Sequence, residues 1–159
     1  MSHTHRQYIS QINGSPETIF DLIANMPNYR RWLPGSRAFA GITQVTPYPV
    51  RLGTTYLDVG PVGERPGRVT EFDRPRHIGF HHTMFVTKGP LTAHINARIR
   101  YTFEPVEGGT FVTRRLDVAV RIPGLLKIAD RLVVSAIHKE NARLLPNLKR
   151  YIEAQPSSA

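Results

Sequence analysis

"LTAHINARIRYTFE", residues 91–104, alternates apolar and polar side chains along its whole length. The apolar positions are Leu91, Ala93, Ile95, Ala97, Ile99, Tyr101 and Phe103. Successive side chains of a β-strand point to opposite faces, so the pattern predicts a strand with one face buried and the other in water. This arrangement is typical of an antiparallel sheet that is covered on one side.

Similar patterns on both sides of this stretch predict the rest of the sheet. Candidate strands cover residues 37–46, 53–60, 66–73, 76–87 and 110–121, with Gly and Pro clusters between them. A short strand is predicted before them, from Tyr8 to Ile12. We therefore expect an antiparallel sheet of about six or seven strands.

Helical patterns occur after the first strand and at the end of the chain. Ser15 is a natural N-cap and Pro16 suits the first helical position, which predicts a short helix that ends at Pro27. A second short helix is predicted from Asn28 to Leu33. Residues 124–154 have the apolar spacing of one long helix, and Pro146 is expected to bend it because proline removes a helical hydrogen bond.

Length and composition predict one globular domain. The 159 residues are 40% hydrophobic, with a single domain expected at 8–154, a flexible N-terminus at 1–7 and a disordered tail at 155–159. The sequence has no cysteine, which excludes disulfides, thiolate catalysis and cysteine-ligated zinc. No apolar run approaches the roughly 20 residues that cross a bilayer, and no signal-peptide pattern opens the chain, so a cytoplasmic location is expected.

The sequence carries a formal net charge of +9. Such a charge makes nucleic acid a partner to consider, but the basic residues are scattered singly or in pairs instead of forming a basic run. We expect no specific nucleic-acid partner. Phosphate-loop, serine-hydrolase and zinc-protease motifs are also missing from the sequence, and neither His3 with His5 nor His81 with His82 makes a good metal site. No metal and no cofactor are expected.

A histidine interrupts the apolar face of the strand "RHIGFHHTMFV", residues 76–86. His82 shares its predicted face with Ile78, Phe80, Met84 and Val86. Its ring could be satisfied by a neighbouring group, or it could bind a ligand or act as general acid or base, since its ordinary pKa of about 6.5 is close to working pH. A bulge that exchanges His82 with His81 would expose it instead.

An arginine interrupts the apolar face of the strand at residues 110–121 in the same way. Arg114 requires either a salt bridge, with Asp58 as one candidate, or an anionic ligand. If the face of Tyr56 and Asp58 points inward, these residues, His82 and Arg114 could form the polar end of a mostly apolar pocket. Tyr29 and Trp32, on the second short helix, are placed to close its mouth.

Several stretches resemble one known superfamily. They are "INGSPETIFDLIANMPNYRRWLPG", "RLGTTY", "VTEFDRPRHIGF", "YTFEPVEGGTFVTRRLDV" and "LLPNLKRYIEA". They are similar to the helix-grip superfamily (SRPBCC) of START, Bet v 1-like and polyketide cyclase/dehydrase proteins, over about residues 8 to 154, and most of all to its polyketide cyclase/dehydrase-like branch. In the ubiquinone-binding START relatives a cysteine often follows the proline; Gly35 stands there in this sequence, which argues against a quinone ligand.

The resemblance implies an α+β helix-grip fold, in which a curved antiparallel sheet wraps around a long C-terminal helix and two short helices follow the first strand. It also implies a cavity between sheet and helix for a hydrophobic small molecule: a lipid, a polyketide or an aromatic compound. The alternative is a polyketide cyclase, aromatase or dehydratase, with His82 as acid/base and Arg114 stabilising an enolate. A third possibility is an interaction module that uses the polar face of residues 92–104.

The expected ligand-binding residues come from the two short helices, the strands and the last helix. They are Tyr29, Trp32, Tyr56, Asp58, Phe80, His82, Met84, Ile95, Ile99, Tyr101, Arg114, Leu116, Leu132 and Ala136. A monomer or homodimer is expected, and its partner is the hydrophobic ligand.

Overall fold

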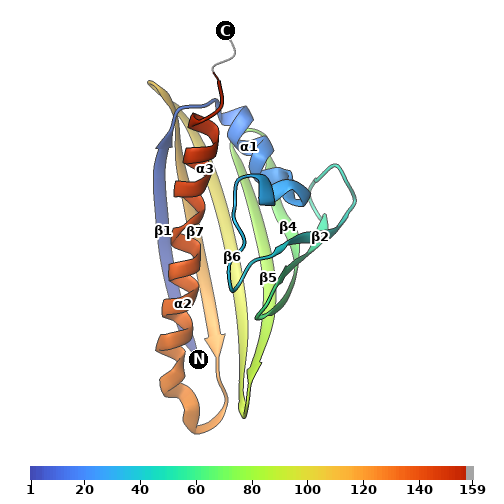
Figure 1. The fold of residues 1–159 in the computed structure, drawn as a ribbon, viewed down its shortest axis with the longest axis vertical. Coiled ribbons are helices and arrows are strands. Elements are labelled where there is room, and N and C mark those ends of the chain that lie inside the picture. Colours follow the sequence, from blue (N-terminus) through green and yellow to red (C-terminus); the bar gives the residue numbers. More distant parts are fainter. Residues whose placement is uncertain (157–159) are drawn as a thin grey trace.

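The computed structural model describes residues 1–156, except for the side chains of Lys88 and residues 125–127. These residues form a seven-stranded antiparallel sheet in the order β1-β7-β6-β5-β4-β3-β2 (Figure 1). The strands are β1 (Ser2–Ile12), β2 (Gly41–Thr46), β3 (Thr55–Gly60), β4 (Gly63–Asp73), β5 (His77–Lys88), β6 (Leu91–Val106) and β7 (Gly109–Arg121). The helix-grip α+β architecture expected from the sequence is confirmed.

The long interior strand β6 has the two faces that its sequence predicts. Its residues from Ala93 to Phe103 alternate between buried and more exposed positions, with the apolar side chains buried. It pairs with β5 on one side and β7 on the other. The buried face of β6 therefore sets the inner face of the whole sheet.

The first strand begins earlier than predicted. β1 starts at Ser2 instead of Tyr8, and residues 2–7, which we expected to be a flexible terminus, pair with Val120–Arg115 of β7. Backbone hydrogen bonds to β7 hold this segment, which carries no large apolar side chain that would identify it as a strand. The tail predicted for 155–159 lies largely outside the described residues.

Two short helices follow β1, as predicted. α1 (Pro16–Ala24) is capped by Ser15, whose Oγ accepts a hydrogen bond from the Thr18 backbone N–H at 3.1 Å. The second, η1 (Met26–Arg31), is a 3-10 helix that begins two residues before the predicted start at Asn28. α1 lies over the inner face of the sheet (Figure 1).

The C-terminal helix is interrupted. It comprises η2 (Gly124–Ala129), α2 (Asp130–Ala142) and α3 (Leu144–Glu153), with Arg143 between α2 and α3. Pro146 lies in the first turn of α3, where its missing N–H costs least, so the helix breaks ahead of the proline instead of bending at it. In the part of the chain described, no helix has the length and apolar character needed to span a membrane.

The two halves of this helix differ in how they pack. α3 buries Leu145, Leu148 and Ile152 in the core. In α2 the one buried residue is the polar Asp130, whereas Leu132 is 74% exposed and Ala136 is also exposed. The fully buried apolar residues of the helix are therefore in α3, whereas α2 packs on the core through the partly buried Val133, Val134 and Ile137.

This difference predicts unequal effects for the same truncation in the two helices. Leu148→Ala should lower the free energy of unfolding by about 2–5 kcal/mol, because it opens a cavity in the core. Leu132→Ala, the matched control in α2, should change it by less than about 0.5 kcal/mol. Urea denaturation of both variants measures this, and equal losses would contradict the packing described above.

Candidate functional site

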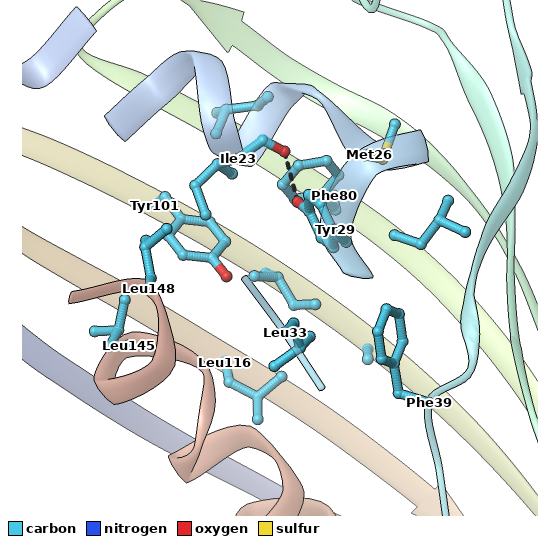
Figure 2. Close-up of a cluster of buried hydrophobic side chains, with 14 of the residues drawn as sticks. Ile23, Met26, Tyr29, Leu33, Phe39, Phe80, Tyr101, Leu116, Leu145 and Leu148 are labelled. Carbon is cyan, nitrogen blue, oxygen red and sulfur yellow. Dashed lines mark hydrogen bonds between the residues drawn. The ribbon is translucent and has the colours of Figure 1, made fainter. Parts of the chain in front are cut away.

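The candidate site lies on the inner face of the sheet, where side chains from five elements converge. Figure 2 shows Tyr29, Leu33, Phe80 and Tyr101 in one buried cluster, with Leu148 of α3 beside Tyr101. Phe80 packs edge-on against Tyr101 and Tyr56, with ring centroids 6.3 and 6.1 Å apart. The middle of the inner face is thus lined mainly by aromatic and aliphatic side chains.

The buried residues of the inner face differ slightly in exposure. Ile12, Phe20, Ile78 and Leu148, near α1 and α3, are fully buried. A second group on the inner face keeps a small contact with solvent; its members Phe80, Met84, Ile95 and Ile99 are 5%, 5%, 8% and 9% exposed. All four belong to the buried core, and the sequence analysis predicted them to line a ligand site.

Tyr56 and His82 meet across an intervening strand. Tyr56 on β3 and His82 on β5 both lie opposite Gly67 of β4, and the Tyr56 hydroxyl is 3.3 Å from His82 Nδ1. A Cβ atom at Gly67 would come within 2.4 Å of the Tyr56 ring. The glycine therefore lets the tyrosine lie over β4 and reach the histidine, and it shows that the face of Tyr56 points inward.

His82 is half-buried, and its environment opposes protonation. Burial, followed by the positive charges of Arg65 and Arg114, lowers the pKa of His82 to about 3. Its ring is therefore neutral near pH 7, in contrast to the sequence-based expectation of an ordinary pKa. Burial also raises the pKa of Tyr56, so the pair is a neutral hydrogen bond.

Arg114 lies deep in the interior with aromatic neighbours. It is 2% exposed and stands directly opposite Tyr101 on one side and Tyr8 on the other. Its Nε donates to the Tyr101 hydroxyl at 2.8 Å, and its guanidinium lies 5.4 and 5.9 Å from the ring centroids of Tyr101 and Tyr8. Its Nη1 is buried and has no hydrogen-bond partner among the described residues.

The salt bridge considered between Arg114 and Asp58 does not form. Asp58 instead accepts a hydrogen bond from Arg65 at 2.6 Å, and the same Arg65 nitrogen donates to the Ala38 carbonyl oxygen. The reason is register: Asp58 and Arg65 stand directly opposite each other in the β3–β4 hairpin. Burial raises the pKa of Asp58, and Arg65 opposes this effect.

The two aromatic residues of the second short helix segment face the interior. The Tyr29 hydroxyl donates to the Ile23 carbonyl oxygen at 2.5 Å (Figure 2), and its ring centroid lies 4.9 Å from that of Trp32. Both are buried, and the Trp32 Nε1–H has no acceptor in the described part of the chain. The inner face therefore contains a second buried donor without a partner.

The predicted residues fall into two groups. Most lie together on the inner face, but Leu132 and Ala136 are exposed on α2, because the helical pattern does not show which side of the helix meets the sheet. Sequence reasoning missed Tyr8 and Arg65. Both could have been found by pairing β1 with β7 and β3 with β4, since each stands opposite a predicted residue.

Two pockets stand out on the surface, and neither is the predicted internal cavity. One of about 490 Å³ lies on the outer face of β1, β6 and β7, and includes Asn96, Arg98 and Asp117. The other, of about 380 Å³, lies between β1 and α2. Within the described residues no group of three or more His, Asp or Glu side chains could hold a metal ion.

Comparisons with solved structures place the fold. A START superfamily protein from Mycobacterium smegmatis is 17% identical with a TM-score of 0.66, over 96% of this chain and 98% of that one. A protein from Mesorhizobium loti is 11% identical with a TM-score of 0.69, over 96% and 99%. An uncharacterised protein from Rhizobium leguminosarum is 17% identical with a TM-score of 0.66, over 97% of each chain.

Comparison with proteins of curated function gives no match. The family model described as "Polyketide cyclase / dehydrase and lipid transport" matches residues 5–153. That match covers every strand and helix of the fold almost completely. The chain therefore belongs to the polyketide cyclase/dehydrase and lipid transport family, and it shares its fold with a START superfamily protein.

Proposed function

We propose that this protein binds a hydrophobic small molecule with an acidic group at one end, on the inner face of the sheet. The observation that carries the proposal is the buried guanidinium of Arg114, whose Nη1 has no partner among the described residues. The coarse role agrees with the family, whose description includes lipid transport.

The charge of Arg114 favours a ligand with an acidic end. A buried charge without a counter-charge is costly, and the Tyr101 hydroxyl and two aromatic rings compensate the Arg114 cation only in part. A carboxylate would supply both the missing charge and the missing acceptor. The unpartnered Trp32 Nε1–H is a second donor for an oxygen atom of a ligand.

The other side chains of the inner face favour a ligand with an apolar body. Phe80, Met84, Ile95 and Ile99 are apolar members of the buried core that keep 5–9% exposure. A hydrocarbon or aromatic ligand would gain about 25 cal/mol for each Å² of apolar surface it removes from water there. α2 contributes only partly buried apolar side chains to the core, whereas α3 contributes three buried ones, so displacing α2 costs less and we expect the ligand to enter beneath it.

The alternative within the same family is a cyclase or dehydratase. A general acid or base works best when its pKa lies near the working pH, and a pKa of about 3 makes His82 a weak base at neutral pH. The positions of His82 and Arg114 also argue against a shared catalytic role. His82 is opposite Ala97 of β6, and Arg114 is opposite Tyr101 of the same strand. The backbones of the two residues are therefore offset by about 13 Å along β6. We therefore favour binding over turnover.

The proposal predicts a preference for acids that depends on Arg114. Decanoate should bind the wild-type protein more tightly than decanol, which has the same chain without the charge. Arg114→Gln should weaken decanoate binding about tenfold or more, since a hydrogen bond to a charged group contributes roughly 1.5–3 kcal/mol, and should leave decanol binding nearly unchanged. Isothermal titration calorimetry measures all four affinities.

The matched control is Arg115→Gln. Arg115 is the next residue of β7 and is exposed on the outer face, so this variant should keep the wild-type preference. Equal affinity of the wild-type protein for decanoate and decanol would contradict the proposal even if Arg114→Gln failed to fold. An equal loss in both variants would assign the effect to overall charge instead.

The neutral state of His82 predicts a specific pH dependence. Below pH 6.5 the unfolded chain takes up a proton at this residue, whereas the folded protein does not until about pH 3. His82 should therefore lower the free energy of unfolding as the pH falls from 6.5 to 3, and His82→Gln should lose less stability over this range. The His82 ring resonances in NMR spectra, assigned with that variant, should stay constant between about pH 8 and pH 4.5. A titration midpoint between about pH 6 and 7 would restore His82 as an acid/base candidate.

A further inference from the structure

A polar pocket of about 380 Å³ separates β1 from α2. The strand contributes Ser2, His3, Thr4 and Arg6, and the helix contributes Asp130, Arg131, Val134, Ser135 and His138. Val134 is the one aliphatic member, and none of these residues belongs to the inner-face site. The contact between α2 and β1 therefore differs from the apolar contacts of α3.

The inner wall of this pocket holds a carboxylate with a free oxygen. Asp130, the first residue of α2, is 7% exposed. Its Oδ2 accepts a hydrogen bond from the Ser2 hydroxyl at 2.5 Å, but its Oδ1 is buried without a partner among the described residues. A buried oxygen in this state is costly, and one donor group would satisfy it.

The outer side of the pocket carries two cations. The side chains of Arg6 and Arg131 are exposed, and neither lies within 4.0 Å of an acidic group in the part of the chain that the structure describes. Each can therefore bind an anion without breaking an existing ion pair. The pocket thus combines a buried acceptor with exposed positive charge.

The remaining polar wall is already ordered. Thr4 Oγ1 lies 2.9 Å from His138 Nε2, and the Tyr8 hydroxyl donates to the His138 carbonyl oxygen at 3.3 Å. Burial, followed by the charge of Arg6, lowers the pKa of His138, so this ring does not add a third cation. Walls that are fixed before binding reduce the entropy lost when a ligand binds.

We propose that this pocket binds a small zwitterion of the amino acid type, with its ammonium group on Asp130 Oδ1 and its acidic group on Arg6 and Arg131. An ammonium fits better than a neutral hydroxyl because it supplies the donor and also neutralises the buried carboxylate. The volume suits a small ligand, since it lies near the lower end of the roughly 300–1,000 Å³ found for ligand pockets. This ligand supplies a hydrogen-bond donor to a buried acceptor. The inner-face ligand, in contrast, supplies an acceptor to buried donors.

The test uses the twenty protein amino acids and O-phosphoethanolamine as probes, each at about 10 mM in a thermal-shift screen of the full chain. The strongest probe and its analogue without the ammonium, such as glutarate in place of glutamate, are then compared by calorimetry. The analogue should bind about tenfold more weakly or worse. Asp130→Asn should remove this difference, and Arg131→Gln should weaken the amino acid itself.

One variant acts as a control. Asp117→Asn removes an exposed carboxylate on the outer face and should leave binding unchanged. If Asp130→Asn does not fold, Arg131→Gln decides, because Arg131 is exposed on the helix surface. The proposal is overturned if no probe binds, if the analogue binds equally, or if Arg131→Gln binds like the wild type.

Discussion

The buried guanidinium of Arg114 is the constraint on which the rest of this account depends. It occupies the inner face of β7 between two tyrosines, with a hydroxyl on Nε and no partner for Nη1 among the described residues. A chain selected for stability alone gains more from an apolar residue there, because a buried charge without a counter-charge opposes folding. An unmet charge of this kind is typical of a binding site, where the ligand completes the interaction.

The surroundings of Arg114 fit this role. The sheet and α3 form a tightly packed end, while α2 is held by polar contacts that involve Ser2, Thr4 and Ser36 and by partly buried apolar side chains. A ligand can therefore enter without breaking the apolar core that stabilises the fold. The two proposed sites differ in place and in chemistry. The inner-face site has buried donors without partners among the described residues, and the pocket between β1 and α2 has a buried acceptor without one.

The fold was predictable because strand periodicity is strong in this sequence. The alternation in residues 91–104 and the N-cap at Ser15 depend on local rules, and each led to the right element, whereas the bend expected at Pro146 is a break ahead of it, at Arg143. The start of β1 was missed because residues 2–7 have polar side chains, and their pairing partner is more than one hundred residues away. Helical spacing also could not show that α2 leaves Leu132 in solvent.

The site was predictable only in outline. A polar residue on an apolar face identified His82 and Arg114 from the sequence, but their partners depend on register across several strands. Tyr56 reaches His82 over Gly67, and Asp58 pairs with Arg65 because the hairpin sets them opposite each other. The pKa of His82 followed from burial, which strand alternation alone does not quantify.

A crystal structure of the protein grown with decanoate tests the central claim most directly. The account predicts the carboxylate within hydrogen-bond distance of Arg114 Nη1 and the alkyl chain along Phe80 and Met84, beneath α2. A carboxylate bound elsewhere, with Arg114 unchanged and the inner face still closed, would contradict it.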